Sequence, residues 1–254
     1  MKDQRHDRDL LDVIVMVLFF VVGLFIGQNY ALWSNLAKDL VGAIATLFAA
    51  FLGSWYAFRL QGEKDRRAEI AVRATSLNSA IFELMRAHNK LIALRNQFIN
   101  PLRMHPDRDF MIQPVAGGSL GTMSIDYKSL GFLFLSEDPN ILGTLAMLDQ
   151  DFAGTLDIIA QRSRMHVEEI QPAVEAVSRA NALGKVTCDQ IAVELGPMKT
   201  KQLGDLSRYM VEGIDNGISA TANAVRDLNR LGRPLVPGFP VLRMAKKGSE
   251  NISV

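Results

Sequence analysis

Histidine and glutamate residues in predicted helices are the side chains of this chain best suited to bind a metal ion. A carboxylate-bridged di-metal site in a helical protein needs a Glu from each of two helices and a Glu-x-x-His pair from each of two others. Here Glu83 and His88 are five positions apart, and His166 precedes Glu169 instead of following it. The spacing therefore predicts no metal site, and we assign no metal-ligating residue.

The other basic and nucleophilic side chains have ordinary structural explanations. His88 and His166 fall on the apolar sides of predicted helices, where a neutral, hydrogen-bonded imidazole is expected and pH sensing is the functional alternative. His105 lies in a charged loop, where a solvated turn is expected rather than a catalytic base. Cys188 is the only cysteine and has no neighbour at metal-ligand spacing, which fits a reducing compartment.

No motif of a known catalytic class occurs in the chain. The glycines between Gly117 and Gly121 lack the Lys-Ser/Thr pair of a phosphate-binding P-loop, and no predicted strand precedes them. A serine nucleophile elbow, the kinase motifs and a metalloprotease helix are also missing. We therefore predict a protein that is not an enzyme, without catalytic residues and without a cofactor. The alternative is an enzyme with a non-standard site in the loop 104–121.

The charge balance argues against nucleic acid as a partner. The formal net charge is +1, and no stripe of Lys and Arg interleaved with aromatic residues occurs in the chain after Arg59. A positive field that would gather phosphate backbones is therefore not expected.

Two long apolar runs near the N-terminus are predicted to span a membrane. Residues 13–26 are all apolar or Gly, and the run extends toward the roughly 20 residues that a bilayer requires. A second run, 40–58, contains only two polar side chains and carries Trp55 and Tyr56 where an aromatic belt is expected. We predict a two-helix transmembrane hairpin over residues 13–60. A cleaved signal peptide is the alternative for the first run.

Basic residues on the short flanks predict the orientation of this hairpin, because such residues stay on the cytoplasmic side. The intervening loop has only Lys38, whereas both outer flanks are basic. The basic residues of these flanks are Lys2, Arg5, Arg8, Arg59, Lys64, Arg66, Arg67 and Arg73. We therefore expect a multi-pass protein of the bacterial inner membrane with a cytoplasmic N-terminal flank, residues 1–12, and a cytoplasmic C-terminus.

Small residues gather on one face of the second span, where they allow close packing between helices. These residues are Gly42, Thr46, Ala49, Ala50 and Gly53. The face can pack against the first span of the same chain or against another subunit, and both alternatives stay open. Gly62, just beyond the bilayer, is the candidate hinge, and a tolerated helix glycine is the alternative.

The remaining chain predicts an all-α domain. Residues 61–100 contain no Pro, so the second membrane helix is expected to continue into the cytoplasm. Its apolar residues recur at alternating spacings of three and four, which predicts the seam of a coiled coil or of an antiparallel helical bundle. The seam residues are Ile70, Leu77, Ile81, Leu84, His88, Leu91 and Phe98.

Further helices are expected at 125–135, from Asp138 and Pro139 to about Pro172, at 188–195 and at 198–231. For the helix that starts at Asp138, the alternative is a continuation beyond Pro172 to Leu183, where Gly184 would end it. Together they predict an elongated cytoplasmic helical bundle over residues 61–234, followed by a C-terminal tail, 235–254.

These features predict a membrane protein whose helical bundle associates with itself or with a cytoplasmic protein and couples that state to the hairpin. In general organisation the chain resembles the small two-span effectors and regulators of bacterial stress and antiphage (antiviral defence) systems, whose assembly disturbs the membrane. The resemblance is architectural and includes no diagnostic motif. A passive membrane anchor or scaffold for another protein is the alternative among non-enzymes.

Overall fold

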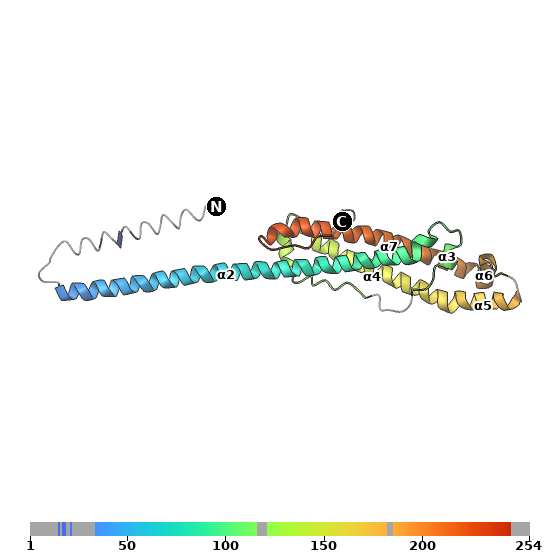
Figure 1. The fold of residues 1–254 in the computed structure, drawn as a ribbon, viewed down its shortest axis with the longest axis horizontal. Helices are drawn as coiled ribbons and strands as arrows, with labels where there is room; N and C mark the ends of the chain where they lie inside the picture. The colour runs from blue at the N-terminus through green and yellow to red at the C-terminus, as the bar shows by residue number, and fades with distance from the viewer. Residues whose placement is uncertain are drawn as a thin grey trace, which may run out of the picture. The chain divides into compact units, whose positions relative to one another are not determined.

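The computed structural model describes residues 15, 17, 18, 21, 34–115, 121–181 and 185–244. Within this part of the chain the regular elements are all helices and no strand occurs, which confirms the all-α class (Figure 1). The chain divides into two compact units, Met1–Arg66 and Arg67–Val254.

Helix α2 (Ser34–Leu94) runs without a break from the second apolar run into the second unit, as the lack of proline predicted. It begins six residues earlier than the predicted span at Leu40. Lys38, which we had placed in the loop between the spans, therefore belongs to the helix. Gly62 lies in the unbroken, exposed part of α2, and its role as a hinge stays a prediction.

The apolar segment of α2 that begins at Leu40 is long and apolar enough to cross a membrane. Its most apolar stretch has a mean hydropathy of 1.7, and none of that stretch is buried. Leu47 is 71% exposed and Phe58 is 78% exposed. Apart from residues 15, 17, 18 and 21, the first predicted span, 13–26, lies outside the described residues, so the hairpin stays a prediction.

The end of α2 changes pitch before Pro101. A π-helical turn, η1 (Arg95–Ile99), is followed by a 3-10 turn, η2 (Asn100–Leu102), because proline has no N–H to continue the α-helical bonds. A short helix, α3 (Arg108–Met111), then forms inside the predicted loop 104–121. The sequence pattern did not predict this helix.

Two predicted helix starts are wrong in detail. The segment 125–135 forms only a 3-10 turn, η3 (Gly131–Leu135), instead of a helix over its whole length. Helix α4 (Ile141–Met165) begins after Asn140 rather than at Pro139. Asp138 accepts a hydrogen bond from the Asn140 N–H at 3.0 Å, so its carboxylate closes a turn ahead of the helix and does not cap it.

The helical chain continues beyond α4 through a π-helical turn, η4 (His166–Ile170), into α5 (Gln171–Ala180). Pro172 is therefore tolerated, because it occupies the first turn of α5 after a change of pitch. This confirms that the helical segment extends past Pro172.

Helices α6 (Cys188–Leu195) and α7 (Pro197–Gly232) follow the predicted ranges within one residue at each end. Thr187 and Gln190 form a capping box at the start of α6. Gly196, with φ of +77°, separates the two helices, and only glycine adopts that backbone conformation without strain.

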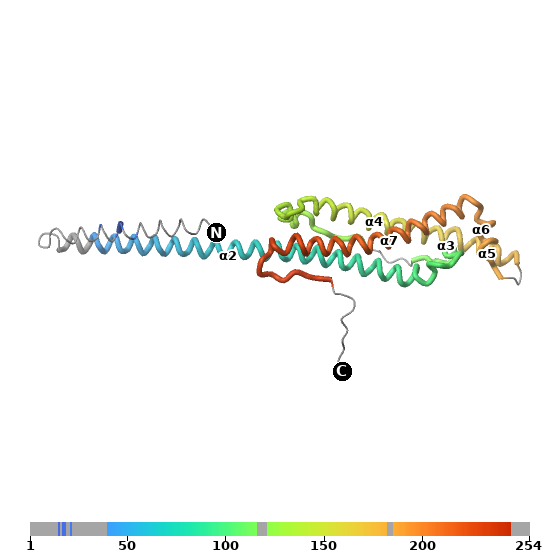
Figure 2. Tube along the Cα trace, turned by 90° about the horizontal axis from the view of Figure 1, so that it is seen from above, coloured from blue at the N-terminus to red at the C-terminus, as the bar shows by residue number. Residues whose placement is uncertain are grey.

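Helix α7 packs antiparallel to both α2 and α4. An added Cβ on Gly232 would lie 2.7 Å from Leu77, whereas one on Gly217 would lie 2.7 Å from Leu91, so rising numbers on α2 meet falling numbers on α7. The three helices lie side by side in both Figures 1 and 2. Helices α2 and α4 consequently run in the same direction.

The long connection between α2 and α4 exists because parallel neighbours need a segment that returns along their length. Val115 N–H donates to Ser163 Oγ in the last turns of α4, whereas Tyr127 Oη contacts the Leu145 carbonyl oxygen near its first turns. Farther along, the Phe132 ring lies beneath the Arg73 guanidinium on α2. Residues 112–115 and 121–135 thus run back along α4.

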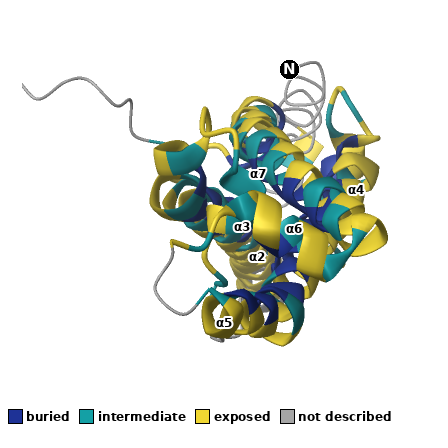
Figure 3. Cartoon of the chain, turned by 90° about the vertical axis from the view of Figure 1, so that its right-hand side faces the viewer, coloured by how far each residue is buried: buried dark blue, intermediate teal, exposed yellow. Residues whose placement is uncertain are grey.

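The principal core lies between the three long helices, and Figure 3 shows buried residues on their inner sides. Its fully buried members include Leu84 and Leu91 of α2, Leu145 and Ile159 of α4 and Leu228 of α7. A second, smaller core joins η4 and α5 to α6 and the start of α7.

Candidate functional site

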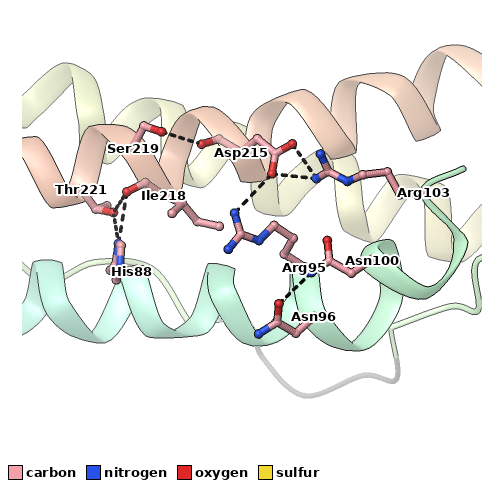
Figure 4. Close-up of polar contacts among 9 residues, drawn as sticks. All are labelled: His88, Arg95, Asn96, Asn100, Arg103, Asp215, Ile218, Ser219 and Thr221. Atoms are coloured by element: carbon pink, nitrogen blue, oxygen red, sulfur yellow. Dashed lines mark hydrogen bonds and ion pairs between the residues drawn. The ribbon is translucent and has the colours of Figure 1, made fainter. Parts of the chain in front are cut away.

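The polar interface between α2 and α7 is the candidate site, and its centre is Asp215 of α7 (Figure 4). Asp215 accepts two hydrogen bonds from Arg103 Nη2, at 3.0 and 2.7 Å. Arg95 of η1 lies with its Nη1 3.8 Å from the same carboxylate. The pitch changes at η1 and η2 bring both arginines to one side, so that a single carboxylate faces two guanidinium groups.

A histidine contact lies next to this cluster. His88 Nδ1 is 3.1 Å from the Ile218 carbonyl oxygen and 3.0 Å from Thr221 Oγ1. Because a carbonyl oxygen only accepts, Nδ1 must carry the proton, and the Thr221 hydroxyl donates in turn to the Gly217 carbonyl oxygen at 2.7 Å. The neutral imidazole therefore fixes the register of α2 against α7.

Burial lowers the pKa of His88 below 6.5, and the nearby Arg95 cation lowers it further. The hydrogen bond to the Ile218 carbonyl oxygen opposes this shift, because it stabilises the charged form. Protonation of His88 would add a positive charge near Arg95, which already shares the Asp215 carboxylate with Arg103. The α2–α7 interface thus combines one titratable imidazole with the ion pairs of Asp215, and we call His88, Arg95, Arg103 and Asp215 together the clasp.

A close approach of the two helices makes the clasp possible. Gly217 of α7 faces Leu91 of α2, and any side chain at position 217 would press on Leu91. Gly213, one turn earlier, lies against Thr155 of α4. Gly213 and Gly217 were not among the predicted packing residues, although their spacing of four is a sequence signal of close helix packing.

A second polar cluster, within the α3, α4 and η4 region, centres on a buried arginine. Arg162 is 1% exposed, its Nη2 donates to the Asp109 carbonyl oxygen at 2.9 Å, and its Nε donates to Ser207 Oγ at 3.4 Å. Burial lowers the pKa of Arg162 to about 10, while the Asp109 carboxylate acts in the opposite direction.

One nitrogen of Arg162 and one of His166 have no partner among the described residues. These atoms are Arg162 Nη1 and His166 Nδ1. Burial lowers the pKa of His166, and the Arg162 cation lowers it further. Both effects favour the neutral form of His166, whereas the hydrogen bond that the sequence predicted for this imidazole is not present at Nδ1 among the described residues.

Four of the seven predicted seam residues are fully buried in the second unit. Leu77, Ile81, Leu84 and Leu91 are each 0% exposed. Ile70 and Phe98 pack at the edge of the core, and His88 is half-buried.

The predicted membrane-packing face is exposed. Gly42 and Gly53 have nothing within 4 Å of an added Cβ, and Thr46 Oγ1 donates to the Gly42 carbonyl oxygen at 2.8 Å within the helix. Ala49 and Ala50 are also exposed. Which surface covers this face stays a prediction.

The loop that we considered as an alternative catalytic site contains local hydrogen bonds. His105 Nδ1 accepts from the Asp107 N–H at 3.1 Å, which is a turn contact between neighbours. Cys188 is half-buried at the start of α6. No group of three or more metal-ligating side chains occurs in the described ranges.

Comparison of the chain with known protein families, with curated proteins and with solved structures finds no match.

Proposed function

We propose that the chain is a non-enzymatic membrane protein whose cytoplasmic helical bundle associates with a second copy or with another protein and couples that state to the membrane segment. The exposed apolar segment of α2 carries this proposal. A stretch of mean hydropathy 1.7 with none of its residues buried is unfavourable in water, and a bilayer satisfies it.

The residues that follow this segment support a cytoplasmic location for the domain. Arg59 lies with its guanidinium carbon 5.7 Å from the centre of the Trp55 ring, an arrangement expected where an aromatic belt meets a basic flank. Further basic residues come directly after Arg59, and the inner leaflet favours them. We place the protein in the bacterial inner membrane, with two spans and both termini in the cytoplasm.

The continuity of α2 supports coupling between the bundle and the membrane segment. The helix contains both the exposed apolar segment and the residues that clasp α7, including His88. A partner that changes the packing of α7 on α2 therefore acts on the same helix that enters the lipid. Such a change would disturb the bilayer around α2 and change the membrane potential when the protein is expressed, as in stress or antiphage responses.

Membrane insertion and orientation can be tested with the native cysteine. The chain has one cysteine, Cys188, so a membrane-impermeant maleimide reports on a single site. Because burial raises the pKa of this thiol, labelling should be carried out at alkaline pH. We expect the chain to resist carbonate extraction and to be labelled only after cell lysis. Labelling in intact cells would contradict the orientation, and extraction by carbonate would contradict insertion.

Self-association can be tested at the small-residue face. Gly53→Leu should reduce chemical cross-linking between copies in membranes, because close helix approach requires a small residue there. Leu47→Ile, at another exposed position of α2, is the matched control and should leave cross-linking unchanged. A strict monomer in mild detergent, together with an unchanged signal from a membrane-potential dye during expression, would exclude the proposed function and favour a passive anchor.

A further inference from the structure

A cavity of about 570 Å³ at the C-terminal end of α7 is lined by four arginines. They are Arg226, Arg230, Arg233 and Arg243. The cavity lies wholly within the second unit, so it is independent of the membrane role proposed above. The first three arginines follow one another at spacings of four and three, which places them on one side of the helix end.

The fourth arginine reaches the cavity because the chain turns back after α7 (Figure 2). Gly238, with φ of +84°, permits the turn. Asn78 of α2 then holds the returning segment, since its amide nitrogen donates to the Pro240 carbonyl oxygen at 2.9 Å and its amide oxygen accepts from the Leu242 N–H at 2.8 Å. Arg243 directly follows this clip.

The positive charges of the cavity are only partly neutralised. Arg230 pairs with Asp227 at 3.5 Å and with Glu137 at 4.0 Å. Arg233 and Arg243 form no ion pair with any other described residue. The dipole of α7 favours cations in its last turn, but it does not account for an arginine brought in from outside the helix. Gathering four guanidinium groups is favourable when an anion lies between them.

The chemistry of the lining indicates which anion fits. Guanidinium groups bind phosphate oxygens through paired hydrogen bonds and are weakly hydrated, so they suit a desolvated phosphate. Val225, Pro234 and Met244 add an apolar part to the wall, which favours a phosphate that carries an organic group. We propose that this cavity binds the phosphate of an organic phosphate ester, supplied either by an anionic phospholipid headgroup or by a soluble metabolite.

Binding can be measured on the full-length chain in detergent by isothermal titration calorimetry. The probes are inorganic phosphate, glycerol 3-phosphate and dihexanoyl phosphatidylglycerol, with dihexanoyl phosphatidylcholine as the zwitterionic comparison. We expect saturable binding of at least one anionic probe that weakens as salt is raised. Preference for phosphatidylglycerol identifies a lipid headgroup as the source, whereas equal or tighter binding of glycerol 3-phosphate identifies a soluble ester.

Variants test whether the arginines carry this binding. Arg233→Ala and Arg243→Ala should each weaken it by about tenfold, since each removes a charge-assisted hydrogen bond. Arg233→Lys and Arg243→Lys keep the charge without the paired geometry and should lose less. The matched control is Arg179→Ala, an exposed arginine on α5 outside the cavity, which should bind as the unaltered chain does.

Three results would overturn the proposal. They are the absence of binding by every anionic probe, unchanged binding in both alanine variants, and an equal loss in Arg179→Ala. Circular dichroism of each variant shows whether the helices are intact, and the lysine variants decide the outcome if an alanine variant unfolds. Both substituted arginines are exposed, so unfolding is unexpected.

Discussion

At the scale of single residues, the polar contacts between α2 and α7 are few and each depends on a defined partner. Asp215 neutralises two arginines, and His88 bonds to a backbone carbonyl oxygen and to Thr221. Around them the packing is apolar and tight. Single substitutions should therefore separate the contribution of packing from that of charge.

Leu84→Asp should strongly destabilise the helical domain. Leu84 is 0% exposed, so the change removes apolar contacts and buries a carboxylate without a partner. We expect a loss of several kcal/mol in the free energy of unfolding. Chemical denaturation of the full chain in detergent measures it. Phe82→Asp, at a position that is 58% exposed, is the control, and an equal loss there would show that burial does not govern the effect.

Acid should weaken the folded domain through half-buried His88 and buried His166. The folded pKa values of His88 and His166 are both lowered below 6.5, chiefly by burial. Between 6.5 and those folded values the unfolded chain binds more protons, so stability is fully present above pH 6.5 and is lost as pH falls.

The pH dependence can be assigned with one substitution. His166→Gln removes a titrating group, so the decrease in unfolding free energy from pH 7.5 to pH 5 should be smaller than in the unaltered chain. A decrease of the same size in both chains would contradict the assignment.

At the scale of elements, glycines decide how closely α7 approaches its neighbours. An added Cβ at Gly213 would lie 2.8 Å from Thr155 Oγ1 and 3.1 Å from its Cγ2. Thr155 is branched at Cβ and buried, so it has little freedom to move aside. Gly154 of α4, by contrast, has nothing within 4 Å of an added Cβ.

The same substitution should consequently have opposite effects at these two glycines. Gly154→Ala should raise the free energy of unfolding by up to about 1 kcal/mol, because alanine favours helix over glycine. Gly213→Ala has the same intrinsic gain, but overpacking costs about 1 to 3 kcal/mol and should lower stability. Thermal unfolding of the two variants measures the difference. Equal stabilisation would show that α7 does not approach α4 this closely.

At the scale of the whole molecule, the exposed apolar segment of α2 is the feature that carries the proposed membrane location. Burial inside the second unit does not account for this segment, because none of its most apolar stretch is covered. A lipid environment is the physical alternative. It predicts that a charged side chain placed in this segment sharply reduces membrane insertion.

Ala50→Asp should impair membrane insertion. A carboxylate in the centre of a span costs about 2.5 to 3.5 kcal/mol, so the fraction of chain in carbonate-resistant membranes should fall. Ala68→Asp is the matched control on the same helix, outside the apolar segment, and should fractionate like the unaltered chain. If both variants remained fully in the membrane fraction, Ala50 would not lie within the bilayer.

The sequence alone determined the features that depend on local pattern. Apolar spacing and the absence of proline predicted α2, α6 and α7, and the helical path beyond Pro172, because helix periodicity and chain-breaking residues act over a few positions. The fully buried positions Leu77, Ile81, Leu84 and Leu91 lie on the apolar face read from that same periodicity.

Only the tertiary structure decided which elements meet. The π-helical turns and α3 were not predicted from local pattern, and the ion pairs of Asp215 with Arg95 and Arg103 join residues more than a hundred positions apart. The four-arginine cavity also requires the returning chain to be held by Asn78. Such contacts arise from antiparallel alignment of α2 and α7, and alignment is set by the total buried surface and not by any short segment.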